Sequence, residues 1–328
     1  MVTKLFNYKS VQWGLSLLII AGALICIFTP NYFLFKMGAS FAIHIMLSYL
    51  VLGIFFLIIR QPRLMFTSFA CCAGLCMFLK YASNADLRLP AQTSNAVFKI
   101  AHFNVSASDE NNYEGMINSI LDAEADLVSI QEVTPDWDVQ FKEQLSREYP
   151  YSSTIVRFDP YGQAIYSKFP LQLVDTFYYK DIPNLIGSFR PSGMSRKIYF
   201  ISSHTTPPLF SNAYEDLRQH LRQIAEYANR IKEPLLTFGD YYAPPWWAEI
   251  QNLKEAANLN DSRRSTQVDV NAFLQNPIDY IFHSSHFECV GFSTITTDSS
   301  SHLGISGTYQ FNSQYFNPEL SNAKAALK

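Results

Sequence analysis

Charged side chains are scarce in this sequence and almost absent from its first quarter. Only 16% of the 328 residues are Asp, Glu, Lys or Arg, well below the roughly 25% usual in soluble domains. Residues 11–29 carry no charge, residues 33–59 contain only Lys36 and His44 as groups that could be charged near neutral pH, and residues 64–79 are again uncharged. This distribution argues against a wholly soluble chain and indicates a membrane segment.

Three apolar runs in this region are each long enough to cross a bilayer. A spanning helix needs about 20 largely apolar residues. Residues 11–29 and 33–59 meet this requirement, and the third run does so once Lys80 and Tyr81 extend to the interface. A cleaved signal peptide is the alternative for the first run, but its apolar core exceeds the usual roughly 7–15 residues and two more runs follow. We therefore predict three transmembrane helices within residues 1–82.

Basic residues are placed asymmetrically around the three runs. Lys4 and Lys9 precede the first run, and Arg60 and Arg63 lie between the second and the third. Because cytoplasmic loops carry an excess of Lys and Arg, both segments are expected on the cytoplasmic side; two basic residues after the third run weaken the asymmetry without reversing it. Three spans then place the C-terminal domain outside the cytoplasm, in the periplasm if the organism is a diderm bacterium.

Cysteine is rare outside the apolar runs. Cys26, Cys71, Cys72 and Cys76 lie within them, which leaves Cys289 alone in the rest of the chain and excludes a disulfide there. The three clustered cysteines suggest a metal site, but small residues at helical spacing in a membrane helix more often serve packing.

Two ionisable residues interrupt the second apolar run. Such residues are functional candidates when they lie within a membrane span. Lys36 is close to one end of the run, so its ammonium can extend to the interface. His44 is interpreted either as a partner in an interhelical hydrogen bond or as a functional group.

A long basic segment is also missing. The net charge is −3, and the longest basic block is the pair Arg263 and Arg264. Nucleic-acid-binding surfaces concentrate Lys and Arg because phosphate contacts dominate their affinity. Nucleic acid is therefore not the expected substrate or partner.

The chain after the apolar runs reads as one α/β domain. Residues 83–96 are polar, contain Pro90 and lack apolar periodicity, as a linker does. From Val97 onward, strand-like runs alternate with stretches of helical periodicity. This alternation is typical of a layered α/β domain, which we place at residues 97–312 and follow with a tail at 313–328.

Six polar residues stand at or just after predicted strands. Loops at strand ends are held by a rigid scaffold, so a site that needs fixed ligands is often built there. A single Asp or Glu at such a position more often caps a turn, and the set gains meaning from its order along the chain. Its members are Asn104 in HFNV, Glu132 in SIQEV, His204 in SSHTTPP, Asp240 in FGDYY, Asp279 in PIDYIF and His302 in SSHLGI.

Together with their flanking segments, these residues resemble the endonuclease/exonuclease/phosphatase family, which has a DNase I-like fold. GQAIYSKFPL is similar to a strand-and-turn segment of that family. SHTTPP followed by FGDYYAPPWW resembles its THxxPP and GDFNAxPW motifs, and NLNDSRR and PIDYIF are similar to its DxxR and PIDHIF segments. The resemblance extends over residues 98–311 and implies a four-layered α/β/β/α sandwich with two central sheets.

The resemblance also implies a metal-dependent phosphoester hydrolase. Hydrolysis develops negative charge on the phosphoryl oxygens, which a divalent metal and hydrogen-bond donors stabilise while a base prepares the attacking water. By resemblance, Glu132 would be the principal ligand of Mg²⁺ or Mn²⁺, with Asn104 beside it. Asp240 would orient or deprotonate the water, and Asp279 would assist the metal or its surroundings. The two histidines of the set would contact the phosphate.

Three positions depart from the family's motifs. Tyr242 replaces the Asn of GDFN, so a much larger ring, whose hydroxyl alone can donate, stands where an amide supports the phosphate and nucleophile. Ser301 replaces the Asp of SDH, so His302 loses the carboxylate that favours its protonated form. Tyr280 replaces the His of DH, a milder change. Because losing one preorganised donor costs on the order of 10²–10³ in rate, the first two changes are expected to suppress turnover.

Two functions are favoured by these residues, and a true nuclease or an unrelated function is the remaining alternative. One is an active or slow metal-dependent hydrolase of a phosphodiester or phosphomonoester at or near the bilayer. The other is a catalytically degenerate member that acts as a binding or structural subunit of a membrane complex with protein partners. The aromatic run of Tyr241, Tyr242, Trp246 and Trp247 suits either function as a surface for a lipid, a sugar-like group or a protein, unless its rings only cover a sheet edge.

The predicted topology can be tested by reporter fusions at Lys328. Because the basic residues favour an extracytoplasmic C-terminus, an alkaline phosphatase fusion is expected to be active and a cytoplasm-dependent fluorescent fusion dark. A fluorescent C-terminus without phosphatase activity would overturn this topology.

Overall fold

The computed structural model divides the chain into two compact units. The helical unit consists of Met1–Asp86, Ala243–Gln251 and Phe273–Pro277, and the sandwich unit of Leu87–Tyr242, Asn252–Ala272 and Ile278–Lys328. Within these bounds the structure describes residues 6, 8–30, 32–83, 97–105, 112–194, 196–263, 277–297 and 304–312.

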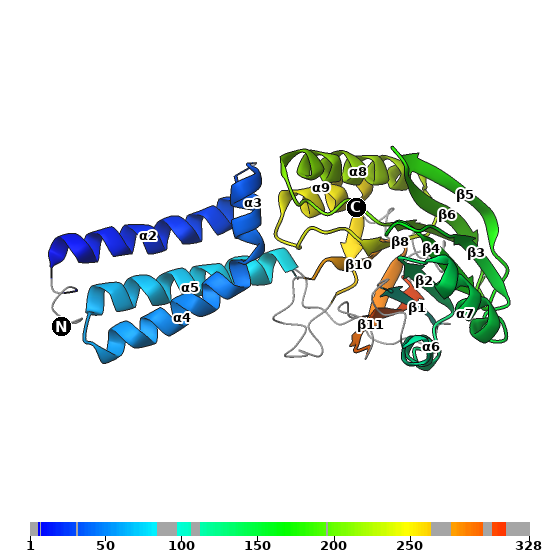
Figure 1. Ribbon diagram of the computed structural model, residues 1–328, viewed down its shortest axis with the longest axis horizontal. Helices are drawn as coiled ribbons and strands as arrows, with labels where there is room; N and C mark the ends of the chain where they lie inside the picture. The colour runs from blue at the N-terminus through cyan, green and yellow to red at the C-terminus, as the bar shows by residue number, and fades with distance from the viewer. Residues whose placement is uncertain are drawn as a thin grey trace, which may run out of the picture. The chain divides into compact units, whose positions relative to one another are not determined.

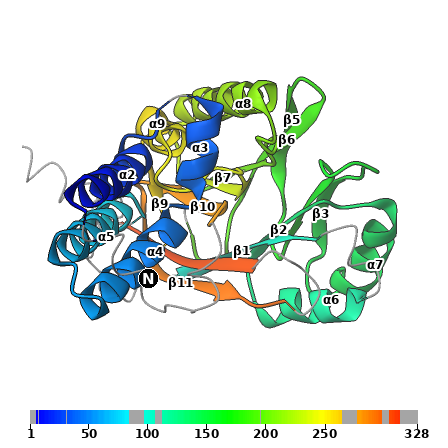
Figure 2. The same ribbon diagram turned by 60° about the vertical axis from the view of Figure 1, so that its left-hand side comes forward.

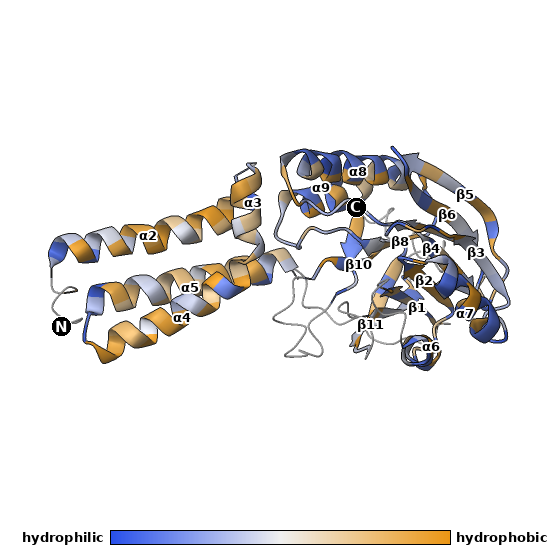
Figure 3. Ribbon diagram, in the orientation of Figure 1, coloured by the Kyte–Doolittle hydropathy of each residue, from blue (hydrophilic) through white to orange (hydrophobic). Residues whose placement is uncertain are grey.

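Four helices are described in the first part of the helical unit: α2 (Lys9–Phe28), α3 (Phe33–Ser40), α4 (Ala42–Ile58) and α5 (Pro62–Ser83) (Figure 1). By length and composition α2 and α5 can each cross a membrane, and α3 with α4 would make a third span that bends by 61°. Hydrophobic residues run along most of α2, α4 and α5 (Figure 3). Two or three apolar helices are thus confirmed, but the second predicted span is two helices instead of one.

The break at Phe41 follows from side chains that compete for the backbone of α3. The Ser40 hydroxyl donates to the carbonyl of Lys36 at 3.1 Å, and the Trp246 indole Nε1 donates to the carbonyl of Ala39 at 2.8 Å. A side chain that inserts into the ladder of helical hydrogen bonds is a usual cause of a sharp kink. Local periodicity could not predict this kink because Trp246 is 207 residues from Ala39 in sequence.

Lys36 does not extend to an interface, contrary to the expectation from its position in the second run. Its side chain is fully buried, and its ammonium lies 2.9 Å from Oε2 of Glu249 and 5.5 Å from the centre of the Trp247 ring. A buried ammonium is costly unless it is paired. The charge is therefore tolerated because Ala243–Gln251, far along the chain, belongs to the same unit.

The other polar candidates of the apolar runs have simpler surroundings. His44 is exposed on α4, and its ring centre lies 5.8 Å from that of Phe41. Cys71 and Cys72 are half-buried and Cys76 is exposed. Among the residues that the structure describes, no three His, Cys, Asp or Glu side chains are grouped so that they could hold a metal ion. The metal interpretation of the cysteine cluster therefore gains no support.

Two six-stranded sheets form the centre of the sandwich unit (Figures 1 and 2). Sheet A has the order β11-β12-β1-β2-β4-β3, and sheet B the order β5-β6-β7-β8-β10-β9. The strands of sheet A are β1 (Val97–Asn104), β2 (Leu127–Gln131), β3 (Tyr151–Ile155), β4 (Gln163–Ser167), β11 (Phe287–Ile295) and β12 (Gly304–Phe311). Those of sheet B are β5 (Gln172–Tyr179), β6 (Ile182–Phe189), β7 (Ile198–Ser203), β8 (Leu235–Asp240), β9 (Leu259–Asp261) and β10 (Asp279–Ser284).

Helices cover the outer faces of both sheets. α6 (Tyr113–Asp122) and α7 (Pro135–Leu145) pack on sheet A. α8 (Ser211–Arg230) packs on sheet B, where the rings of Tyr227 and Phe177 stack at 3.9 Å. α9 (Ala248–Ala257) begins in the helical unit and ends in the sandwich unit. The resulting α/β/β/α arrangement confirms the predicted fold class.

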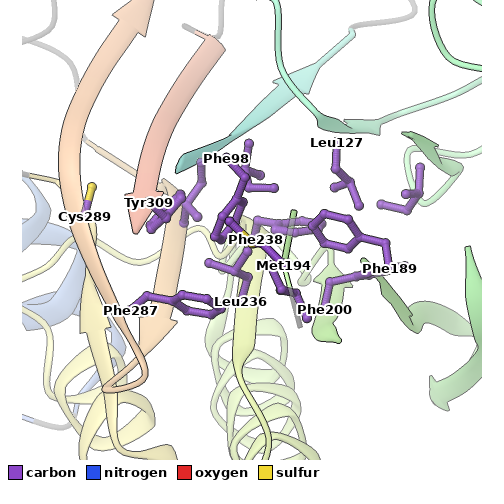
Figure 4. Packing of buried hydrophobic residues seen from close by; sticks show 14 of the residues in the cluster. Phe98, Leu127, Phe189, Met194, Phe200, Leu236, Phe238, Phe287, Cys289 and Tyr309 are labelled. Carbon is purple, nitrogen blue, oxygen red and sulfur yellow. The ribbon is translucent and has the colours of Figure 1, made fainter. Parts of the chain in front are cut away.

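The alternation of side chains along each strand separates two apolar clusters. On β1, Phe98 and Ile100 belong to the cluster between the sheets (Figure 4), whereas Ala101 and Phe103 pack with α6 and α7. A slip of one residue would exchange the two faces. Burial on both sides therefore fixes the register of β1, which is parallel to β2 and antiparallel to β12.

Removing Lys36 alone is expected to destabilise the helical unit more than removing both partners of its ion pair. Lys36→Met leaves Glu249 buried without this ammonium, and breaking a buried pair typically costs about 3–5 kcal/mol. Lys36→Met with Glu249→Leu removes both charges, a change that is often nearly neutral. Thermal unfolding of the full chain in detergent measures the difference, with Lys80→Met at an exposed position as the control. Equal losses in the single and double variants would contradict the role of the pair.

Candidate active site

The inward faces of five strands change from apolar to polar at the same end of the sandwich. β1 is parallel to β2, β7 is parallel to β8, and β10 is antiparallel to β8, so the carboxyl ends of the first four strands and the start of β10 form this end. The inward residues run Phe98, Ile100, His102 and Asn104 on β1, Leu127, Ser129 and Gln131 on β2, Phe200 and Ser202 on β7, Phe238 and Asp240 on β8, and, in reverse, Ile281 and Asp279 on β10.

Gln131 connects the two sheets at this end. Its Nε2 donates to the carbonyl of Ser203 at 2.8 Å, and its Oε1 accepts from the amide of Asp240 at 2.9 Å. The approach is close enough to require glycine at position 239, where φ is +151° and an added Cβ would lie 1.8 Å from the Ser203 carbonyl oxygen. The ends of β2, β7 and β8 are therefore held together by one buried carboxamide.

Five of the six predicted strand-end residues lie at this end, in the sandwich unit. Asn104 closes β1 and Asp240 closes β8, both buried. Asp279 opens β10 directly opposite Asp240. Glu132 follows β2 with a left-handed backbone at φ +64° and is half-buried, and His204 follows β7 with no exposed surface. The sixth, His302, lies outside the described residues, as does Ser301.

Tyr242 contacts two members of this group, His204 and Asp240. Its hydroxyl lies 3.3 Å from His204 Nε2, and the two rings stack with centres 5.5 Å apart. His204 Nδ1 lies 2.8 Å from the carbonyl of Pro160 and donates to it, so Nε2 of the neutral ring accepts from the phenol. Burial raises the pKa of the Tyr242 phenol, and the carboxylates of Asp240, Glu132 and Asp279 raise it further. The hydroxyl thus contacts His204 and lies within electrostatic range of three acidic side chains.

The backbone of Tyr242 is held in an unusual conformation. Its φ is +47°, a region that residues other than glycine rarely adopt. Its amide donates to Oδ1 of Asp240 at 2.9 Å, which is the local turn that an Asp side chain commonly makes two residues ahead. Asp240 thus fixes the direction in which the phenol leaves the strand.

Tyr280 and Tyr241 lie on the other face of sheet B. Because side chains alternate along a strand, the ring of Tyr280 points away from the face of Asp279; it stacks on Tyr241 and Phe282 with centres 5.7 Å and 4.8 Å away. The Arg263 guanidinium lies 4.8 Å from the centre of the Tyr280 ring. The replacement of the family's His by Tyr280 therefore puts no ring among the acidic side chains.

The predicted aromatic surface is not open. Tyr241 and Trp247 have no exposed area, and Trp246 is 3% exposed. Trp246 and Trp247 contact α3 within the helical unit, through the Ala39 carbonyl and Lys36 respectively. A lipid or sugar cannot stack on rings that are already covered, so these three residues do not form the binding surface considered from the sequence.

The oxygen donors at this end suit a hard divalent cation. Mg²⁺ is usually held by one or two carboxylates together with waters and substrate phosphates, and not by a complete protein cage. In the described part of the chain, no group of three or more His, Cys, Asp or Glu could hold a metal ion by itself. The carboxylate of Glu132 and the amide oxygen of Asn104 are oxygen donors of the kind that Mg²⁺ or Mn²⁺ takes as ligands.

Sequence analysis missed the polar residues that lie one step deeper in the sandwich. His102, Ser129, Gln131 and Ser202 are all fully buried and follow apolar residues on the same strand faces. Their signal in the sequence is a polar residue at alternate positions of an otherwise apolar strand, before the strand ends.

Comparison with known proteins gives a consistent family and fold. The profile of the Endonuclease/Exonuclease/phosphatase family matches residues 101–302, more than half of the chain. A family protein from Bacteroides vulgatus aligns with a TM-score of 0.55 at 15% identity, over 66% of this chain and 100% of that one. Humanised D. rerio TDP2 aligns at 0.53 and 20% over 65% and 99%. ANGEL2, described as a 2′,3′-cyclic phosphatase, aligns at 0.53 and 16% over 66% and 96%. No curated protein matches significantly.

Proposed function

Because this chain belongs to the endonuclease/exonuclease/phosphatase family, we propose that it is a membrane-anchored, metal-dependent phosphoester hydrolase. The observation that carries the proposal is that Asp240 and Asp279 face each other across two strands, that Gln131, next to Glu132, binds the Asp240 amide, and that His204 contacts the nearby Tyr242 hydroxyl. Phosphoester hydrolysis needs acidic groups that bind a metal and activate a water. It also needs a hydrogen-bond donor to the phosphoryl oxygen.

Each residue has a role that its position supports. Glu132 and Asn104 would hold Mg²⁺ or Mn²⁺, which would supply charge stabilisation for the phosphoryl oxygens. Asp240, fixed by the Tyr242 amide, would orient or deprotonate the attacking water. Asp279, directly opposite on β10, would assist the metal or its surroundings. His204 donates from Nδ1 to the Pro160 carbonyl, which orients Nε2; on taking up a proton there, the imidazolium would donate to a phosphoryl oxygen. By resemblance His302 would be its counterpart.

Tyr242 limits access to this arrangement. Its hydroxyl already uses the His204 nitrogen that a substrate would need, so a phosphoryl group must displace the phenol or bind beside it. This contact favours slow turnover of generic phosphoesters. It is also the observation that supports a second candidate function, a catalytically degenerate family member that serves as a binding or structural subunit of a membrane complex.

The helical unit supports a substrate that lies at or near a bilayer. α2 and α4 expose large apolar side chains such as Leu18 and Ile58 at 69% and 73%, which lipid would cover in a membrane. The net charge of −3 offers no concentration of positive charge for nucleic acid. A phosphodiester or phosphomonoester on a lipid or an isoprenoid carrier, met on the extracytoplasmic side, is therefore the proposed substrate class.

Metal binding tests the hydrolase proposal directly. Calorimetric titration of the full chain in detergent with Mn²⁺ or Mg²⁺ is expected to show binding that Glu132→Gln abolishes, because a neutral amide is a much weaker ligand for a hard cation. Glu148→Gln, on an exposed acidic residue, serves as the control and should bind as the parent does. No binding at millimolar metal would reject the hydrolase and favour the degenerate subunit.

Restoring the family residues at the two replaced positions is expected to raise activity. Tyr242→Asn frees His204 Nε2 and returns an amide donor, and Ser301→Asp returns an acidic neighbour to His302. Since both act on the same transition state, the double variant should exceed either single one, on the order of 10²-fold above the parent with bis(p-nitrophenyl) phosphate. Parent activity that the double change reduces would instead mean that Tyr242 is adapted to a particular substrate. No activity in any folded variant would leave only the degenerate subunit.

A further inference from the structure

A buried row of polar side chains crosses the sandwich just inside the candidate active site. The Ser202 hydroxyl lies 3.2 Å from that of Ser129, which lies 3.1 Å from Nδ1 of His102. Nε2 of His102 lies 3.5 Å from Oδ1 of Asp279. The row thus passes from β7 to β2 and β1 and back to β10, and Ser202, Ser129 and His102 have no exposed surface.

The acceptor at one end sets the direction of the row. An ionised Asp279 carboxylate can only accept, so His102 faces it with an Nε2–H. The other ring nitrogen, Nδ1, then accepts from the Ser129 hydroxyl, whose oxygen accepts from Ser202. The composition is that of a Ser–His–Asp catalytic triad, but a nucleophile must reach substrate, and Ser129 is sealed between the sheets. The row therefore orients side chains and does not supply a nucleophile.

Asp279 requires such a partner because of its neighbour. It lies directly opposite Asp240 on the adjacent strand, and like charges in this relation destabilise a sheet. Asp240 is held on its own side by the Tyr242 amide. On β10, the Arg263 guanidinium binds the backbone carbonyl of Asp279, while His102 Nε2 lies beside Oδ1 of its carboxylate.

We propose that His102 is a positioning residue for the active site: through an Nε2–H directed at Oδ1, it holds the Asp279 carboxylate apart from Asp240 and in a fixed orientation. The proposal rests on the proposed hydrolase for its catalytic consequence, but not for the contact itself. At 3.5 Å the contact is longer than a short hydrogen bond, and it acts as an attraction between the ring N–H dipole and the carboxylate charge, which a low-dielectric interior strengthens.

The contact is tested by nitrogen-15 NMR of the full chain in detergent, with only histidine labelled. The His102 ring, identified by its loss in His102→Gln, is expected as the Nε2–H tautomer, and Asp279→Asn should shift its nitrogen and proton signals. Ser129→Ala should shift the Nδ1 signal while the tautomer stays the same. An Nδ1–H tautomer, or His102 signals unmoved by Asp279→Asn, would overturn the proposal whether or not the protein is an enzyme.

The consequence for the site is tested with Mn²⁺ affinity and with hydrolysis in the Tyr242→Asn background. Residues that orient metal-site groups typically contribute about 10–100-fold, so His102→Met should lower Mn²⁺ affinity or kcat by that factor with little change in KM. His102→Gln, whose Nε2 can still donate to Asp279, should recover most of it. His220→Gln is the matched control: His220 is equally buried and its Nε2 lies 2.9 Å from Asn184 Oδ1, so it should lose stability without this effect.

The two proposals fail in different ways. If the parent binds no Mn²⁺ and hydrolyses nothing, the hydrolase proposal fails, and the NMR result alone decides the His102 contact. If the parent binds Mn²⁺ but His102→Met and His102→Gln both match it, the positioning role fails while the hydrolase proposal stands.

Discussion

The structure of the sandwich unit depends on the cost of burying polar groups between two apolar sheets. A buried amide left without partners costs about 1–3 kcal/mol, and Gln131 avoids this cost only where Ser203 and Asp240 lie together. This condition joins β2 of sheet A to β7 and β8 of sheet B at one point. Glycine is required at position 239 so that the strands can come this close, because a Cβ there would collide with the Ser203 carbonyl oxygen. The residues that follow, among them Glu132 and His204, then reach the same end of the sandwich.

The parts that could be predicted from sequence are those with a local signature. A polar residue at the end of an apolar strand is visible in the chain, and this pattern alone predicts Asn104, Asp240 and Asp279 as site residues. Gln131 and His102 have the same chemistry, but their partners are 109 and 177 residues away and belong to the other sheet. Nothing near either residue in sequence indicates which group it would contact. The sequence therefore does not predict that Ser202, Ser129, His102 and Asp279 form one row.

The same limit explains the differences in the helical unit. A lysine in an apolar run is expected to seek water, and only Glu249, 213 residues later, shows why Lys36 stays buried. An anchor needs nothing more than apolar surface, whereas this unit contains a paired charge and an indole hydrogen bond to a helix break. Removing residues 1–86 would deprive Glu249 of its ammonium and Trp246 of its acceptor. The four helices are therefore part of what keeps Ala243–Gln251 folded.

The substitution of Tyr242 changes the backbone as well as the side chain. A left-handed conformation costs a residue other than glycine of order 1–3 kcal/mol, and asparagine tolerates it better than tyrosine does. This chain keeps the turn at φ +47° with the less suitable residue. Two sets of contacts offset this strain. The Asp240 carboxylate accepts from the backbone amide of Tyr242, and the His204 imidazole stacks on the Tyr242 ring and accepts from its hydroxyl. These contacts involve both the backbone and the side chain of Tyr242. The Tyr242 phenol is therefore a structural part of the site, and its hydrogen bond affects the protonation of His204 Nε2.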